Sequence, residues 1–154
     1  MRKKFVTNEK EIEEIILTAQ TCYLAMVDEN NLPYVVPMNF GFQNGTFYLH
    51  SGLPGKKMSI LQKNNHICLA LDIDSKLHVV SENTACSYSM KYKSVIAHGK
   101  IKFIENYDEK VEGMNIIMKH YIDKEFTYNK PAIDNVAVFT LKPTEITAIN
   151  RGYC

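Results

Sequence analysis

Two consecutive lysines stand where the sequence changes from a strand-like pattern to a helical one. Gly55 closes a Gly/Pro turn, and Lys56 and Lys57 open the helical pattern that follows. A helix N-terminus already carries about half a positive charge and presents free N–H groups, so two ammonium groups there favour a bound anion. A phosphate monoester suits such a site better than a carboxylate does. Two solvated lysines would give the same spacing, so both interpretations stand at this point.

The elements that position these lysines are short strands joined by tight turns. Asn44-Gly45 predicts a two-residue hairpin, and the strand after it leads into the turn that carries Gly55. The preceding strand, residues 33–42, is interrupted by Pro37. A proline cannot donate to a strand ladder, so this strand is expected at an edge, or bulged, with free backbone groups near Pro37.

Three helices are expected to cover these strands. Asn8 and Thr7 are candidate N-caps for the first helix, with Glu11 three residues after Asn8 in capping-box position. A second helix follows Gly55 and stops near residues 64–65. The third covers residues 108–122. Residues 91–104 read as one long strand, residues 81–90 as a loop, and residues 123–135 as a mobile surface connection.

The order of these elements predicts a mainly β protein. Strands outnumber helices by about two to one, and the first turns are too short for parallel crossovers. We therefore expect a single domain over residues 1–154, built as an antiparallel barrel with helices outside. A barrel this small holds side chains or one small ligand, so a larger cofactor has to sit at its rim or between two subunits. A homodimer is the natural expectation.

Composition narrows the classes of partner and site. The chain has 154 residues, of which 45% are apolar and 23% charged, and its 18 basic residues nearly balance its 17 acidic ones. That balance disfavours nucleic acid and acidic membrane surfaces as partners. The sequence has no apolar run of the ~20 residues that a membrane span needs, which predicts a cytoplasmic protein. Its four cysteines form no Cys-x-x-Cys pair, and its five histidines show no zinc-protease spacing, so no metal site is predicted.

A second group of residues points to the same kind of ligand. Tyr88 and Tyr92 alternate with Lys91 and Lys93 near the start of the long predicted strand, and Ser94 follows. This group is the other candidate for contacting an anion.

Five stretches, in this order, resemble the nitroimidazole-resistance branch of the pyridoxamine 5′-phosphate oxidase-like flavoproteins. They are Leu24-Ala25-Met26, Pro33 to Phe40, Tyr48-Leu49-His50-Ser51 with Gly55-Lys56-Lys57, Cys86 with Met90, and Tyr92-Lys93-Ser94-Val95-Ile96 with Gly99. The resemblance covers residues 7–149. It implies a split β-barrel and a homodimer that binds flavin in a groove at the subunit interface.

The resemblance also assigns roles to residues at matching positions. It places Val36, Pro37, Met38 and Asn39 along the isoalloxazine ring of FMN, or of FAD as the alternative. It places His50 and Ser51 beside the ring or ribityl chain, with His50 as the candidate for contacting an electron acceptor. The phosphate contacts would be Lys56, Lys57, Tyr92, Lys93 and Ser94. This chain departs from the family at Lys93, where arginine is common, and at His98, where relatives often carry an aromatic or apolar residue.

The activity implied by the resemblance is flavin-dependent reduction. A nicotinamide donor would reduce the flavin, and a small electron-poor acceptor such as a nitroimidazole or quinone would reoxidise it. Two other classes remain open. One is a non-enzymatic flavin- or haem-binding protein of the same fold, with His50 or His98 as a candidate axial ligand. The other is an interaction module without a cofactor. The C-terminal arginine motif of true pyridoxamine phosphate oxidases is missing, so vitamin B6 oxidation is not expected.

Overall fold

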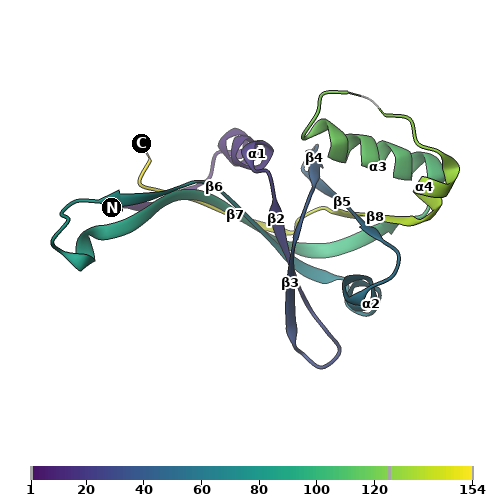
Figure 1. The fold of residues 1–154 in the computed structure, drawn as a ribbon, viewed down its shortest axis with the longest axis horizontal. Coiled ribbons are helices and arrows are strands. Elements are labelled where there is room, and N and C mark those ends of the chain that lie inside the picture. The colour runs from purple at the N-terminus through teal and green to yellow at the C-terminus, as the bar shows by residue number, and fades with distance from the viewer. Residues whose placement is uncertain (1, 125, 154) are drawn as a thin grey trace.

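A computed structural model describes residues 2–124 and 126–153, so Met1, Glu125 and Cys154 lie outside the description. The mainly β architecture predicted from the sequence is confirmed (Figure 1). The strands are β1 (Lys3–Val6), β2 (Cys22–Val27), β3 (Pro33–Met38), β4 (Gly41–Gln43), β5 (Thr46–Gly52), β6 (His66–Val79), β7 (Tyr88–Ile104), β8 (Val136–Leu141) and β9 (Glu145–Arg151). The helices are α1 (Glu9–Thr18), α2 (Lys56–Lys63), α3 (Tyr107–Lys119), α4 (Lys130–Asp134) and the 3₁₀ turn Ala85–Ser87.

The nine strands form one antiparallel sheet in the order β3-β2-β6-β7-β8-β5-β4, with β9 pairing both β7 and β1. Strand β3 pairs with β2 alone among the described strands, so it is an edge strand, as Pro37 predicts. The 33–42 strand of the sequence prediction is in fact two strands, separated by Asn39 and Phe40. Strand β4 then turns back along β5 through Asn44-Gly45, where both residues have positive φ as a two-residue hairpin requires.

The core lies between the strands and the helices. Alternate residues of β2, β6 and β7 point inward and are buried, among them Leu24, Leu69 and Val95. Helix α1 packs on β6 and β7 through Ile15 and Ile16, whereas α3 packs on β4, β5 and β8. The Asn8 side chain accepts hydrogen bonds from the N–H groups of residues 10 and 11, which confirms the predicted start of α1.

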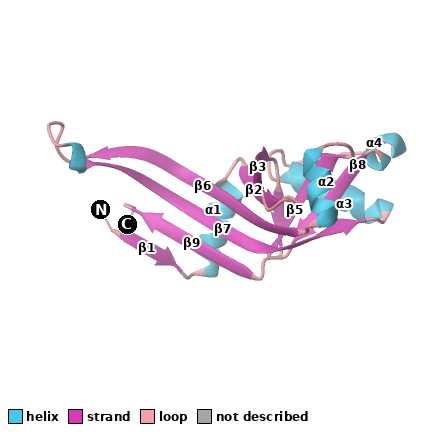
Figure 2. Ribbon diagram, turned by 90° about the horizontal axis from the view of Figure 1, so that it is seen from below, coloured by secondary structure: helices cyan, strands magenta, loops and turns pink. Residues whose placement is uncertain are grey.

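The middle of the molecule continues into a long two-stranded ribbon. Strand β6 is continuous over 14 residues and β7 over 17, so the predicted 81–90 loop is shorter than expected. Their pairing shifts between Ile73 and Lys76, at a bulge where Asp74 has a φ of 57°. Beyond this bulge, residues 76–79 pair only with residues 88–91 among the described strands, and we call residues 76–91 the arm. Figure 2 shows it extending past the ends of β1 and β9.

Two further elements were not expected from the sequence. The short strand β1 pairs with β9 at the other end of the chain. Helix α4 occupies part of the stretch predicted as a mobile connection; it has Asn129 as its N-cap and buries Ile133. Both elements depend on residues distant in sequence, which local patterns do not report.

Candidate flavin site

The N-terminus of α2 differs from those of the other α-helices in lacking a side-chain acceptor. Helices α1, α3 and α4 are each capped by an asparagine side chain, whereas the N-cap of α2 is Gly55, which makes no side-chain cap hydrogen bond. Gly55 has φ 132° and ψ 166°, a conformation that only glycine adopts readily. The first turn of α2 contains Lys56 and Lys57 and no acidic residue. Its free N–H groups and two cations therefore favour an anion.

The two lysines lie in different environments. Lys56 is exposed, and its Nζ lies 4.6 Å from the centre of the Tyr34 ring on β3. Lys57 is half-buried, and its Nζ lies 3.7 Å from Sδ of Met38 at the end of the same strand. Burial lowers the pKa of Lys57. The start of α2 is thus in contact with the β3 edge that the sequence predicts for the flavin ring.

His50 completes this cluster from β5. Its Nδ1 is buried and has no hydrogen-bond partner among the described residues. Burial lowers the pKa of His50, and the nearby positive charge of Lys57 lowers it further. The neutral imidazole of His50 therefore lies near the half-buried ammonium of Lys57, and the buried Nδ1 of this imidazole has no hydrogen-bond partner among the described residues. A buried polar atom of this kind is usually hydrogen-bonded, so a polar ligand is expected here.

The sequence analysis did not identify two residues, Cys22 and Tyr121, as part of this region. Cys22 on β2 is fully buried, its thiol lies 3.6 Å from the Met38 carbonyl oxygen, and burial raises its pKa to about 12. Tyr121, just after α3, accepts a hydrogen bond from the Phe40 N–H at 3.1 Å and donates one to the Gln20 carbonyl at 3.0 Å. It holds the chain immediately after Asn39. Both contacts join residues far apart in the sequence, and no local pattern signals them.

The predicted residues of β5 and β7 divide between faces. Ser51 follows His50 on one strand, so the two side chains point to opposite faces of the sheet. The same alternation separates Lys93 from Tyr92 and Ser94. Exposure follows this pattern, because Val95 and Ala97 on the Lys93 face are buried while Ile96 on the Tyr92 face is exposed. Tyr92 and Ser94 therefore share one face of β7, and Lys93 lies on the other face.

The structure does not bring residues 92–94 together with α2 within one chain. Tyr92 pairs with Arg151 and Lys93 with Asn150, both at the C-terminal end of β9. Lys91 and Lys93 lie over the ring of Tyr153, at 5.7 and 5.8 Å from its centre. In Figure 1 the C-terminus and α2 lie on opposite sides of β2 and β3. One chain therefore holds two separate halves of the predicted site.

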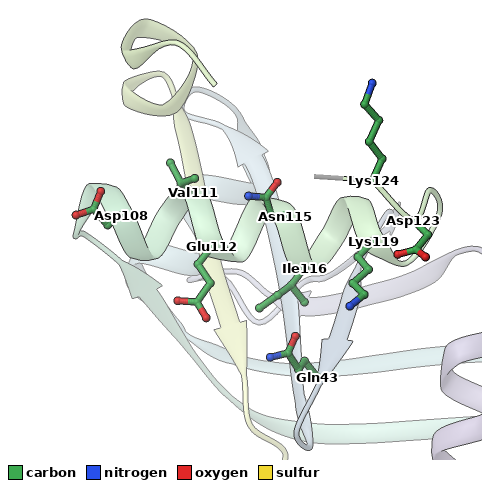
Figure 3. Close-up of a pocket in the computed structure, with 9 residues that line it drawn as sticks. All are labelled: Gln43, Asp108, Val111, Glu112, Asn115, Ile116, Lys119, Asp123 and Lys124. Atoms are coloured by element: carbon green, nitrogen blue, oxygen red, sulfur yellow. The ribbon is translucent and has the colours of Figure 1, made fainter. Parts of the chain in front are cut away.

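A hollow on the other side of the molecule contains none of the predicted residues. It has a volume of about 660 Å³ and lies between the exposed side of α3 and Gln43 of β4 (Figure 3). Its side chains include Asp108, Glu112 and Lys119, which point outward from the helix as on a solvated surface. We assign it no part in the site.

Comparison with known proteins decides the family. The profile of the pyridoxamine 5′-phosphate oxidase family matches residues 8–150, which is most of the chain. The chain belongs to the pyridoxamine 5′-phosphate oxidase family. Within this family, a Bacteroides thetaiotaomicron protein provisionally named for 5-nitroimidazole antibiotic resistance is 40% identical, over 96% of this chain and 87% of that one, with a TM-score of 0.85.

Two more distant solved structures share the fold. A FAD and haem binding protein from Mycobacterium smegmatis has a TM-score of 0.87 at 13% identity, covering 97% of this chain and 74% of that one. A flavocytochrome from Azotobacter vinelandii has a TM-score of 0.84 at 19% identity, covering 97% and 70% respectively. No curated protein sequence matched this chain. At these identities the two structures establish the fold of the family and nothing further.

No helix in residues 2–124 and 126–153 is long and apolar enough to cross a membrane. The same residues contain no group of three or more His, Cys, Asp or Glu side chains that could hold a metal ion.

Proposed function

We propose that this chain is a cytoplasmic flavin-binding oxidoreductase that holds the phosphate of FMN at the start of α2. The observation that carries the proposal is the cluster of Lys57 and His50. Within residues 2–124 and 126–153, the half-buried Lys57 has no acidic partner, and the buried Nδ1 of His50 has no hydrogen-bond partner. A flavin nucleotide offers what these two side chains lack, because it combines an anionic phosphate with a ring rich in hydrogen-bonding groups. FAD shares that phosphate and is the alternative.

The β3 edge fits the flat ring of this ligand. Pro37 lies beside Tyr23 at the end of the β2–β3 ladder, and the ladder stops at Met38. The backbone from Pro37 to Asn39 therefore has groups that no neighbouring strand takes up among the described residues. Met38 itself is buried and backs the edge with a polarisable apolar surface.

The proposed site requires a second copy of the chain. The arm carries five exposed large apolar side chains, Leu77, Val79, Val80, Tyr88 and Met90. A two-stranded ribbon alone is marginally stable in water, and exposed apolar surface of this extent marks an interaction surface. We infer that the arm docks on a partner subunit and brings residues 92–94 to the α2 end of the partner's site. The two halves that one chain keeps apart then meet at the interface.

The flavin, when bound, supplies the redox chemistry, accepting a hydride from a nicotinamide nucleotide and passing electrons to a small acceptor such as a nitroimidazole or quinone. The chain's own residues bind and orient. Lys56 and Lys57 neutralise the phosphate. His50 stays neutral at physiological pH because its pKa is lowered, so it presents a hydrogen-bonding imidazole rather than a second cation to the acceptor. Met38 and Cys22 exclude water behind the ring. The 40% identity to the protein named for 5-nitroimidazole resistance supports this choice of acceptor.

The test is flavin retention in two charge-reversal variants. Lys57 and Lys10 occupy the same second position of their helices, α2 and α1. A glutamate at either position is favourable for the helix dipole, so neither change should weaken its helix. Lys57→Glu should lower the affinity for FMN at least tenfold, because it places a carboxylate against the phosphate. Lys10→Glu should leave it unchanged. If the Lys57→Glu variant and the native protein bind FMN with equal affinity, the phosphate does not bind at the start of α2.

The absorption spectrum of the purified protein tests the class of cofactor. Bands near 450 nm that bleach with NADH or NADPH support the reductase, and mass spectrometry of the released cofactor separates FMN from FAD. Flavin that neither nicotinamide bleaches would favour a storage or sensing protein. A Soret band would favour haem.

A further inference from the structure

A thiol and an imidazole that the proposed flavin site does not use face each other across two central strands. Cys68 on β6 is the cross-strand partner of His98 on β7, and Sγ of Cys68 lies 3.8 Å from Nε2 of His98. Cys68 is half-buried and His98 is exposed. The pair lies near the start of β6 and the end of β7, at the opposite end of these strands from the arm.

The neighbouring strands hold the pair in place. Ala25 of β2 is the cross-strand partner of Cys68 on one side, and Glu145 of β9 is the partner of His98 on the other. The carbonyl of His98 accepts two hydrogen bonds from Thr144, one from its N–H at 2.9 Å and one from its hydroxyl at 3.3 Å. The histidine backbone is therefore fixed by β9 and the turn before it. This rigidity favours a constant distance between thiol and imidazole.

The pair opens into a hollow that is cationic. The hollow has a volume of about 530 Å³, and His66, Lys100 and Lys142 contribute to its wall together with the pair itself. No carboxylate of the described residues lines it, and Glu145 is the cross-strand partner of His98 on β9. The remaining wall is largely apolar, from β2 and β3. Such a hollow suits a small anionic molecule rather than a cation.

The other described cysteines lack these features. Cys22 is fully buried, and burial raises its pKa to about 12. Cys86 is exposed on the 3₁₀ turn at the tip of the arm, and its thiol has no hydrogen-bond partner among the described residues. Reactive cysteines are partly exposed and lie beside cationic groups. Among the described cysteines, Cys68 alone combines partial exposure with a histidine at hydrogen-bond distance.

We propose that Cys68 and His98 form a thiol–disulfide exchange site for small anionic disulfides. Nε2 of His98 takes the thiol proton as Sγ of Cys68 attacks one sulfur of the disulfide. A new S–S bond forms between Cys68 and that sulfur, and the original S–S bond breaks. The leaving sulfur takes the proton back from the imidazolium and departs as a thiol. One disulfide is consumed, one mixed disulfide and one thiol are formed, and no outside oxidant is needed.

The environment makes His98 necessary for this step. Burial raises the pKa of Cys68, so at neutral pH the group is a thiol and a standing thiolate is scarce. The proton must leave during the attack, and His98 is the acceptor within reach. His66, Lys100 and Lys142 face the same hollow and attract the anionic disulfide, while Glu145 is the acidic group nearest to His98 along the sheet.

The experiment treats the full chain with oxidised glutathione, an anionic disulfide, or with cystamine, a cationic one. Peptide mapping by mass spectrometry then gives a separate rate for each cysteine, with Cys86 as the exposed reference. Cys68 should react faster with oxidised glutathione than with cystamine, relative to the same ratio at Cys86. His98→Gln should slow Cys68 at least tenfold, since a positioned general base contributes about a hundredfold or more, and should leave Cys86 unchanged.

The native protein provides a second measurement that needs no variant, namely the ratio of the rate with oxidised glutathione to the rate with cystamine at each cysteine. An equal ratio at Cys68 and Cys86, an equal Cys68 rate in the His98→Gln variant, or no reaction at Cys68 would each overturn the proposal.

Discussion

The hydroxyl of Tyr121 accepts a hydrogen bond from the backbone N–H of Phe40 at 3.1 Å, although 81 residues separate the two in the sequence. The same hydroxyl donates to the carbonyl of Gln20 at 3.0 Å. Tyr121 thereby links Gln20, two residues before β2, to Phe40, the residue after the proposed ring-binding edge. His120 supports the same junction, since its ring lies 4.4 Å from that of Phe40 and its Nε2 lies 2.7 Å from the Ala19 carbonyl oxygen.

Tyr121→Phe should destabilise the protein by about 2 kcal/mol, because it leaves the Phe40 N–H and the Gln20 carbonyl without their shared partner. Urea unfolding measures the free energy of unfolding directly. Tyr23→Phe is the matched control, because Tyr23 is 47% exposed and its hydroxyl has no hydrogen bond to any residue that the structure describes. If both variants have the same stability as the native protein, the junction does not depend on this hydroxyl.

Gly55→Ala should weaken FMN binding through the backbone alone. A Cβ at Gly55 meets no atom within 4 Å, but the φ of 132° is one that alanine rarely adopts, and adopting it costs about 1–3 kcal/mol. The chain will relax by moving the first turn of α2. Gly52→Ala is a close control, since a Cβ there also meets nothing and no positive φ is involved. FMN titration of both variants should show weaker binding for Gly55→Ala only, and equal affinities would show that the turn tolerates a side chain.

Acid should destabilise the flavin-free protein partly through His50. The pKa of His50 in the folded chain is lowered from its ordinary 6.5 by burial and by Lys57. As the pH falls below 6.5, the unfolded chain gains a proton at this residue before the folded chain does. The free energy of unfolding therefore decreases between 6.5 and the lower, folded-state pKa. His50→Gln should lose less stability than the native protein over this interval.

The influence of Lys57 on His50 can be measured separately. In Lys57→Met the repulsion between the two groups is gone, so the pKa of His50 should rise, as followed by NMR of the imidazole. Lys10→Met, on a different helix, should leave it unchanged. A His50 pKa that is the same in both variants would mean that burial alone accounts for the lowering.

The arm offers a test of the proposed dimer. Met90→Asp places a charge among the exposed apolar side chains of the arm, where Met90 is 42% exposed, and should shift the protein from dimer to monomer. Leu17→Asp makes a comparable change on α1, where Leu17 is 47% exposed, and should not alter the assembly. Light scattering after size-exclusion chromatography gives the mass of each species. A native protein that is already monomeric at micromolar concentration would contradict the docking of the arm.

The sequence predicted those elements that depend on local chemistry. Gly55 followed by two lysines indicated the start of a helix, and Pro37 indicated an edge or a bulge in its strand; the structure has α2 beginning at Lys56 and β3 at an edge. The hairpin at Asn44-Gly45 and the cap at Asn8 follow from short-range patterns in the same way. Each of these residues acts within a few positions of itself.

Short-range sequence patterns do not predict contacts between segments that are distant in the chain. Strand β1 exists because it pairs with β9 at the other end of the chain, and Tyr121 matters because of Phe40 and Gln20. The placement of Lys93 on the face opposite Tyr92 and Ser94 could have been predicted from the sequence. Side chains alternate between the two faces of any strand, so consecutive residues of β7 point to opposite faces. His98 was noted as a departure from the family and as a candidate axial ligand, but its pairing with Cys68 was not predicted, since the two lie 30 residues apart.

The edge strand β3 has a consequence for the protein before any ligand binds. Pro33 and Pro37 both occupy the strand, four residues apart and so on the same side of its backbone. Edge strands with free N–H groups recruit other chains into growing fibrils, and prolines block this by removing the donors. In the ligand-free protein, the edge of β3 can therefore stay unpaired with little risk of aggregation.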